Sequence, residues 1–362
     1  MNGGNSDSTD EADGRLAGLS APRLFTEASI EVYPEIQRWK KRVRHVDTDH
    51  PKPTTWERVF RPAIVLYCNF LGMTPTEIID DRRKTFARTD DEMIRRKHEE
   101  LYDRFVERVK LLSRKDDHRK RLASWTQSAK VVAVRSFYKR NYYALVEVEG
   151  VRGKVERLLH IPTQEELGRM VLACENTLYS AAMVGQAQSG MGEGDLLSIS
   201  WDQESADFGT VAAQLRDGRE YIHVHFDRGK TGVTFDSFFG PETLRWMRKP
   251  EFPKSAKGLV FDFKETTWQQ RVRKAQAHAK VPGIVTAHCL RKFFSNQLKL
   301  TRVGDPAWEP DLIEYWCGHS LGGIRSAYMA PSVPEQLRLR RLAEARLVPI
   351  YPPEFERDGL KE

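Results

Sequence analysis

The sequence predicts a mainly α-helical chain of two domains, the second of which holds a small antiparallel β-sheet. Its 362 residues are enough for two domains of ordinary size, and 40% of them are hydrophobic. Apolar residues recur mostly at helical spacing, and one stretch of the second half alternates in the manner of strands. We therefore expect helices packed around buried cores, with one sheet among the helices of the second domain.

The first domain is expected to be all α-helical and to span residues 54–145. Residues 1–20 are polar and rich in Gly, Ser and Asp, so a disordered tail is expected before it. Apolar positions at helical spacing predict its main elements. Helices are expected at residues 54–71, shortly after 76, 90–113 and 122–140, and one short helix is expected before the domain at 35–46.

Positive charge is concentrated in this domain. Basic residues exceed acidic ones by 58 to 51 over the whole chain, but residues 82–140 hold 19 basic and 9 acidic residues. Such a local excess suggests a polyanionic partner, although a solvated, salt-bridged helical face explains the charge equally well. An apolar stripe of the helix at 122–140 is expected to face the core and comprises Trp125, Val131, Val134 and Phe137. The other side would face such a polyanion with Lys130, Arg135, Lys139 and Arg140.

The second domain is expected to span residues 160–345, after a linker at 146–159 that contains Gly150 and Gly153. Thr163, followed three residues later by Glu166, predicts a capping box at its first helix. Most later segments have helical patterns. Three segments instead alternate or are rich in β-branched residues, which predicts a three-stranded antiparallel sheet from residues 209–214, 220–226 and 232–239.

Several classes of protein are disfavoured by what the sequence lacks. No apolar run approaches 18 residues, so no membrane-spanning helix is expected. The polar, acidic start resembles neither a signal peptide nor a transit peptide. None of the four cysteines sits in a C-x-x-C pair, which gives no sign of a disulfide framework. A reducing, cytoplasmic setting is therefore expected.

Two motifs are attractive at first sight and are set aside. The glycines of residues 190–194 resemble a dinucleotide loop, but the Ala-rich segment before them has a helical rather than a strand pattern, so nucleotide binding is not expected. Cys289 beside His288, and Cys317 near His319, lack the spacing of a zinc finger, so no metal site is expected. Buried thiols near a polar site are the plainer interpretation.

Three spaced elements carry the chemistry of the second domain. His288 and Arg291 form a His-x-x-Arg motif on a predicted helix, where positions i and i+3 share a face. Gly318-His319 is followed, nine residues after the histidine, by Tyr328. Lys230 lies in the turn between two predicted strands. Each motif alone is weak, because such residues are usually surface, capping or core residues.

Together, and in this order, these motifs resemble those of the tyrosine recombinase family, the phage-type site-specific integrases. The resemblance covers most of residues 160–345 and implies the family's two-domain architecture, a helical core-binding domain followed by an α+β catalytic domain. It also implies integration or excision of a mobile element by breaking and rejoining double-stranded DNA, with a homotetramer acting on the DNA. No metal, nucleotide or other cofactor is implied.

The residues also suit attack on a phosphodiester. Arg291 can donate a fork of N–H groups to phosphate oxygens, and His319 can donate another hydrogen bond. His288 can help to take the proton of Tyr328, whose ordinary pKa near 10 requires a cationic surround for nucleophilic attack. Lys230 can protonate the departing 5′-hydroxyl. The product would be a 3′-phosphotyrosyl link.

One position departs from the family pattern. The family's first arginine box reads roughly Thr-Gly-x-Arg-x-x-Glu-Leu, and the matching stretch, residues 189–197, has Gly192 at the arginine position. Three accounts stay open: a catalytically impaired DNA-binding protein, a lineage-specific or deliberate loss, or substitution by another cation. Arg228, two residues before Lys230, is the candidate substitute and DNA contact. A type IB topoisomerase is a further alternative that the Gly-His…Tyr spacing disfavours.

Overall fold

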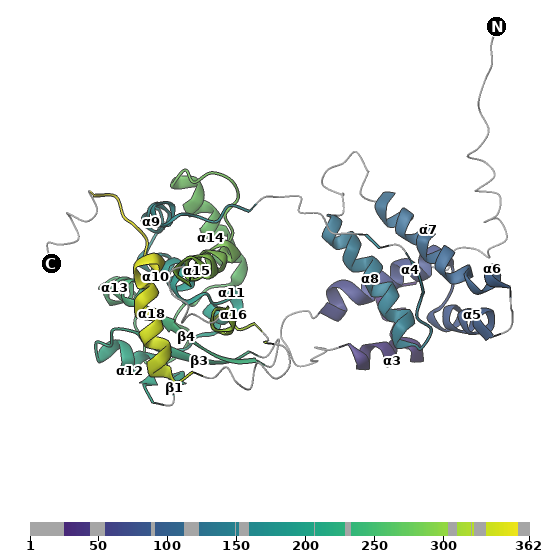
Figure 1. Cartoon of the computed structure of the whole chain (residues 1–362), viewed down its shortest axis with the longest axis horizontal. Helices are drawn as coiled ribbons and strands as arrows, with labels where there is room; N and C mark the ends of the chain where they lie inside the picture. Colours follow the sequence, from purple (N-terminus) through teal and green to yellow (C-terminus); the bar gives the residue numbers. More distant parts are fainter. Residues whose placement is uncertain are drawn as a thin grey trace, which may run out of the picture. The chain divides into compact units, whose positions relative to one another are not determined.

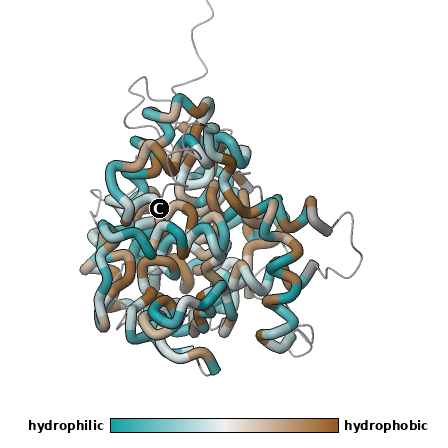
Figure 2. Tube along the Cα trace, turned by 90° about the vertical axis from the view of Figure 1, so that its left-hand side faces the viewer, coloured by the Kyte–Doolittle hydropathy of each residue, from teal (hydrophilic) through white to brown (hydrophobic). Residues whose placement is uncertain are grey.

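The computed structural model describes residues 25–43, 55–87, 91–111, 123–148, 150–151, 159–205, 207–228, 233–302, 310–319, 321 and 331–353. The chain divides into two compact units, residues 1–156 and 157–362 (Figure 1). Both units are built mainly of helices, and the strands pair antiparallel in the second unit. The expected fold class is therefore confirmed. Brown and teal alternate along the helices in Figure 2, as amphipathic helices require.

Helices make up the first unit. Its elements are α2 (Glu27–Ile30), α3 (Pro34–Arg42), the π-helical turn η1 (Trp56–Phe60), α4 (Arg61–Leu71), α5 (Pro75–Ala87), α6 (Glu92–Arg95), α7 (Lys97–Leu111) and α8 (Ser124–Arg140). Helix α4 ends where expected, because Gly72 takes the left-handed conformation that a C-cap favours. The core between these helices is aromatic, with Trp39 packed against Trp56, Phe60 and Phe137.

A buried polar relay links four helices of this core. The hydroxyls of Tyr67 on α4 and Tyr138 on α8 lie 3.0 Å apart, and Tyr138 lies 2.9 Å from His98 Nδ1. On the other side of the ring, His98 Nε2 lies 3.0 Å from the Asp81 carboxylate on α5. Burial, the first cause, lowers the pKa of His98 to about 4 against the attraction of Asp81. The ring is therefore neutral in the fold, with Nε2 donating to Asp81 and Nδ1 accepting from Tyr138.

Acidification is expected to destabilise the first unit through His98. Its imidazole takes a proton near pH 6.5 in the unfolded chain but only near pH 4 in the fold. Between these values the unfolded state binds more protons, so stability falls as pH falls, by about 3 kcal/mol over the window. Urea unfolding at pH 7.5 and pH 4.5 checks this, and His98→Gln should flatten the dependence. An equal loss in both proteins would contradict the assignment.

Two expectations for the first unit are wrong. The helix expected at 90–113 is divided at Arg96 into α6 and α7, and Met93 on α6 is 74% exposed. The buried side of α7 instead includes polar His98 and Glu99, whose partners are on α5. Trp125, expected in the apolar stripe of α8, is 63% exposed. It is the second residue of α8.

The second unit contains helices and two small sheets. Its elements are α9 (Gln164–Leu172), α10 (Thr177–Ser189), α11 (Glu193–Ser198), β1 (Glu204–Ser205), β2 (Gly209–Thr210), α12 (Val211–Arg216), β3 (Ile222–Arg228), β4 (Val233–Phe239), α13 (Pro241–Arg248), α14 (Glu265–His278), α15 (Ala287–Arg302), α16 (Pro310–Trp316) and α18 (Val333–Leu347). The capping box of Thr163 and Glu166 is present at α9, which confirms that prediction.

The expected three-stranded sheet is wrong. Strands β3 and β4 pair from Ile222↔Phe239 to Arg228↔Val233, but residues 211–216 form helix α12 instead of a third strand. Thr210 caps that helix by accepting from the Ala213 N–H. The side-chain amide of Gln214 then replaces a strand, because it bonds both the N–H and the C=O of His223. Gly209 and Thr210 pair only with β1.

Helix α10 is the centre of this unit, and its residues 180–189 are all buried. It contacts α13, α15 and β4 among other elements. The helix ends at Gly190, whose φ of +70° is left-handed, and a Cβ there would clash with the ring of Phe294. Only glycine fits this close approach to α15. The end of α10 is thereby fixed against the helix that carries the His-x-x-Arg motif.

Candidate active site

Helix α15 presents His288 and Arg291 one turn apart. The expected helix is confirmed, and the two residues lie at i and i+3 near its start. His288 is exposed, whereas Arg291 is 6% exposed and buries most of its side chain. Arg291 Nη1 donates to the Gly190 carbonyl oxygen at 3.1 Å. The end of α10 therefore orients the guanidinium.

The segment with the missing arginine lies beside this guanidinium. It runs from Gly190, the C-cap of α10, to Gly192, the N-cap of α11. The Gly192 N–H donates to the Asp195 carboxylate at 3.2 Å, which caps the first turn of α11. Since Gly190 contacts Arg291 directly, a long side chain at Gly192 would start two residues from that contact.

The Gly-His motif follows α16. Gly318 has a left-handed φ of +61°, and a Cβ there would lie 2.8 Å from the ring of Phe235 on β4. The next residue, His319, is half exposed, and its Nδ1 lies 2.5 Å from Glu314 Oε2. Glu314 also pairs with Lys299 on α15, at 3.7 Å. With Nδ1 facing a carboxylate, the ring can donate to a further ligand from Nε2 when it carries both protons.

The two motifs lie on elements that pack together, because α15 contacts α16, and Lys299 of α15 pairs with the same Glu314 that bonds His319. Although His288 is exposed by surface area, partial desolvation of its ring and then the charges of Lys292, Arg291 and His319 lower the pKa of His288 below its ordinary value. Burial raises the pKa of the Cys317 thiol to about 11, and the Arg291 guanidinium is the largest opposing influence. The lowered pKa keeps the His288 imidazole neutral near pH 7, as a group that accepts a proton must be.

Two central residues of the prediction lie outside the described residues. These are Lys230, between the ends of β3 and β4, and Tyr328, between α16 and α18. Arg228 ends β3, and only its backbone is described. The structure brings together His288, Arg291 and His319 and leaves the positions of the nucleophile and the general acid as predictions. Within the described part of the chain, no group of three His, Cys, Asp or Glu residues could hold a metal ion.

Helix α8, in the first unit, carries the cations expected to contact DNA. Arg135, Lys139 and Arg140 are exposed, but Lys130 is partly buried, and burial lowers its pKa. Arg135 and Lys139 are four residues apart and share a side of the helix. Val132, which is 52% exposed, lies on the same side. This face combines positive charge with exposed apolar surface.

Two acidic residues of the site were not identified from the sequence. Glu314 orients His319, and Asp236 on β4 accepts hydrogen bonds from several elements of the unit. Glu314 precedes His319 by five residues, a spacing with no special meaning in a helix. Asp236 lies on a strand whose alternating pattern predicts which side chains face inward, but this pattern does not predict their hydrogen-bond partners. Neither residue has a recognisable motif.

In the described ranges, no helix has the length and apolar character needed to cross a membrane.

Comparison with solved structures finds similar folds over most of the chain. The XerA recombinase structure is 16% identical, covers 85% of this chain and 96% of its own, and has a TM-score of 0.33. Lambda integrase residues 75–356 bound to DNA are 14% identical, with 70% and 94% covered and a TM-score of 0.43. The integrase from mycobacterium phage Brujita is 15% identical, with 83% and 90% covered and a TM-score of 0.37.

No family model and no curated protein matches the sequence. Likeness of fold at this level of identity does not assign an activity, because one fold hosts many functions. The activity must be inferred from the side chains of this chain.

Proposed function

We propose that the chain is a site-specific DNA recombinase that breaks and rejoins strands through a 3′-phosphotyrosyl link to Tyr328. The observation that carries the proposal is the cluster of His288, Arg291 and His319 where α15 meets the ends of α10 and α16. A guanidinium and two imidazoles in one cluster can bind a phosphate group and stabilise the charge that develops while it is transferred. The order of these motifs, with Lys230 before them and Tyr328 after them, supports the same reaction.

In the proposed reaction, the phenol oxygen of Tyr328 attacks the scissile phosphorus and passes its proton to His288. The bond between phosphorus and the 5′-oxygen breaks, and Lys230 protonates that oxygen as it leaves. Arg291 and His319 stabilise the charge that develops on the non-bridging oxygens. Attack by a 5′-hydroxyl on the phosphotyrosine reverses these steps and reseals DNA. One phosphodiester replaces another, so neither step requires ATP.

The biological setting proposed is integration or excision of a mobile element. Exchange between two duplexes needs four cleavage events, which a homotetramer with one nucleophile per subunit would supply. The exposed cations of α8 would contact the duplex. A second candidate is a DNA-binding protein with impaired catalysis, and Gly192 is the observation that favours it.

Covalent capture tests the proposal and does not require the target sequence to be specified. The full chain is incubated with duplexes that carry a nick flanked by randomised sequence. Cleavage close to the nick releases a short fragment with its 5′-hydroxyl, so the protein–DNA link cannot be resealed. Complexes that survive denaturant are sequenced. We expect recovery of one related set of sites, whereas binding without any denaturant-resistant complex would favour the second candidate.

Gly192→Arg is expected to raise the rate of adduct formation by up to about 100-fold. Gly192 has φ −67° and ψ 159°, which any residue adopts, so arginine adds no backbone strain there. From this position a second guanidinium would approach the phosphate bound by Arg291. Single-turnover rates and DNA affinity are measured together, and the affinity profile across sequences should stay the same. Unchanged or slower cleavage would show that another cation already fills the role.

Arg228→Ala, made in both backgrounds, identifies that cation. If Arg228 substitutes for the missing arginine, its loss should slow the wild type strongly and the Gly192→Arg variant much less. Equal losses in the two backgrounds would mean that Arg228 acts elsewhere, for example in binding DNA.

DNA binding is expected to weaken steeply with salt and to depend on α8. Removing two phosphate contacts with Arg135→Gln and Lys139→Gln should lower the slope of log affinity against log salt by about 2. Arg338→Gln with Arg346→Gln, two exposed cations of α18, is the matched control for net charge. Titrations at several salt concentrations measure both slopes. An unchanged slope in the α8 variant would show that these charges are only a solvated face.

A further inference from the structure

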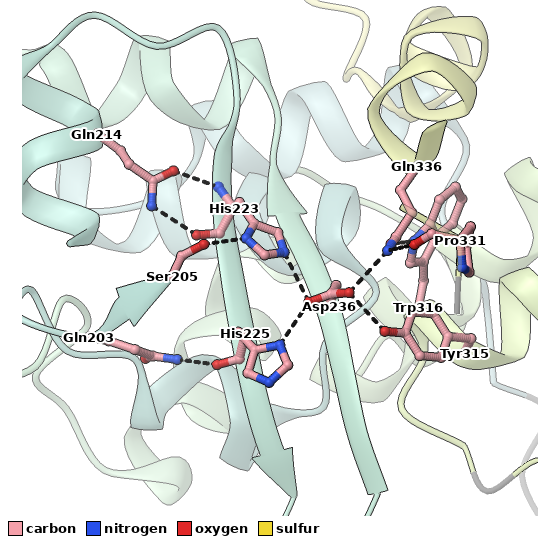
Figure 3. A network of polar contacts seen from close by, with 10 residues as sticks. All are labelled: Gln203, Ser205, Gln214, His223, His225, Asp236, Tyr315, Trp316, Pro331 and Gln336. Atoms are coloured by element: carbon pink, nitrogen blue, oxygen red, sulfur yellow. Dashed lines mark hydrogen bonds and ion pairs between the residues drawn. The ribbon is translucent and has the colours of Figure 1, made fainter. Parts of the chain in front are cut away.

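The buried carboxylate of Asp236 on β4 accepts four hydrogen bonds from side chains of three elements (Figure 3). Its Oδ1 accepts from His223 Nε2 at 3.0 Å and from His225 Nδ1 at 2.8 Å. Its Oδ2 accepts from the Tyr315 hydroxyl at 2.8 Å and from Gln336 Nε2 at 3.0 Å. Burial opposes ionisation, but these donors together hold the pKa of Asp236 far below its usual range, so the group is an anion.

The donors belong to the segments that carry the proposed catalytic residues. His225 is on β3, five residues before Lys230, and Asp236 is six residues after Lys230 on β4. Tyr315 is on α16, four residues before His319. Gln336 is in the first turn of α18, eight residues after Tyr328. One carboxylate thus ties the β3–β4 hairpin to the elements on both sides of the nucleophile.

Further hydrogen bonds reinforce the links between these segments. Gln336 donates to the Pro331 carbonyl at 3.0 Å and accepts from Trp316 Nε1 at 2.7 Å, so it also joins α18 to α16. On the hairpin side, Ser205 bonds the other ring nitrogen of His223. In Figure 3 these side chains form a continuous line from β1 across the hairpin to α18. Each polar group in the line has a partner, as a stable buried network requires.

The order Ser205, His223, Asp236 resembles a hydrolase triad, but its burial excludes that role here. The three residues are 2%, 5% and 8% exposed. A substrate cannot reach the Ser205 hydroxyl through the packed chain, so the arrangement cannot perform nucleophilic attack in this fold. Its chemistry is that of a structural clamp with an ionised centre.

We propose that Asp236 is a positioning residue for strand cleavage, which holds the segments carrying Lys230, His319 and Tyr328 in one register. The inference rests on the proposed function and adds a residue that touches neither DNA nor the reacting atoms. Nucleophile, general acid and phosphate donors come from separate segments, and no covalent link sets their spacing. A displacement of about 1 Å between reacting groups can cost about 100-fold in rate.

Asp236→Asn is the first test. The amide has the same shape, but its one oxygen cannot accept from all four donors, and its NH₂ group faces donors on one side. We expect single-turnover adduct formation to fall about 10- to 100-fold, with DNA affinity within about twofold of wild type. If the wild type cleaves DNA and Asp236→Asn cleaves at the same rate, the inference about Asp236 is wrong and the proposed function is unaffected.

Glu242→Gln is the matched control. The Glu242 carboxylate accepts from Trp246 Nε1 at 3.1 Å and from the Tyr351 hydroxyl at 2.6 Å, so it is also the centre of a polar cluster. Its partners lie on α13 and near the end of the described chain, and none of them belongs to the proposed mechanism. Adduct formation by this variant should stay within about twofold of wild type. A loss equal to that of Asp236→Asn would reduce Asp236 to a general stabilising role.

A sulfur-substituted substrate separates the two sides of the clamp. When sulfur replaces the 5′-oxygen of the scissile phosphate, the leaving thiol has a pKa near 8.5 and needs no general acid. His225→Ala should disturb mainly the hairpin with Lys230, so its rate loss should largely disappear on this substrate. Tyr315→Phe should disturb the His319 side, and its loss should persist. The same response from both variants would contradict separate positioning.

Hydrogen exchange tests the coupling without any catalysis. In Asp236→Asn, peptides from β3–β4, α16 and the start of α18 should all exchange faster than in wild type. A change confined to β4 would overturn the proposed clamp. Failure of the proposed function and failure of the Asp236 inference can therefore be told apart. If the wild type forms no adducts, the proposed function is wrong. Hydrogen exchange still shows whether Asp236 joins the three segments.

Discussion

A Tyr328→Phe variant is expected to form no covalent protein–DNA adduct and to bind DNA with nearly wild-type affinity. Loss of one phenol oxygen removes the nucleophile and leaves the cations of the site in place. No other group in the proposed mechanism forms a bond to phosphorus, so the expected loss is complete. Denaturing gels with labelled nicked duplexes measure the adduct, and titration measures affinity.

Tyr179→Phe is the matched control for this experiment. Tyr179 lies on α10, and its ring contacts Phe263 away from the proposed site. The same atom is removed from the same residue type, and adduct formation should be unchanged. A Tyr328→Phe protein that still forms adducts at the wild-type rate would remove Tyr328 from the mechanism, whatever the control shows.

Replacing Arg291 with alanine is expected to slow adduct formation about 100- to 1000-fold, far more than it weakens binding. The forked contact to phosphate matters most as charge develops in the transition state, so the loss should appear in the single-turnover rate. Arg291→Lys keeps the charge but not the fork, and we expect intermediate rates.

Arg291 also has a structural contact, its bond to the Gly190 carbonyl, so stability must be measured beside the rate. Both variants should unfold cooperatively, and rates should be compared at temperatures where each is folded. If Arg291→Ala cleaves within a few-fold of wild type, the guanidinium serves only to fasten α15 to the end of α10.

The sequence predicted those parts of the fold that local patterns determine. The capping box at Thr163 and the end of α4 at Gly72 follow from backbone chemistry within a few residues. The prediction of a third strand was wrong because Thr210 caps a helix and the Gln214 side chain bonds the backbone of His223 at the edge of β3. That contact joins residues nine positions apart. Trp125 has the spacing of a core residue, yet only the packing of α8 determines which of its apolar residues are covered.

In the candidate site, too, local patterns predicted some residues, whereas contacts between distant residues could not be predicted. His288 and Arg291 were predictable because a helix places i and i+3 on one face. The contact of Arg291 with Gly190 spans 101 residues, and the bond between Asp236 and Gln336 spans 100. No local pattern predicts such contacts. The positions of Lys230 and Tyr328 are still predictions, since the described residues do not include them.

The most direct test of the central claim is to locate the atom that links this chain to DNA. Adducts captured on nicked duplexes are digested with nuclease and trypsin, and the modified peptide is sequenced by mass spectrometry. We predict a nucleotide attached through a 3′-phosphate to Tyr328, in the peptide that follows Arg325. Attachment to any other residue, or tight DNA binding with no covalent link under these conditions, would contradict the account.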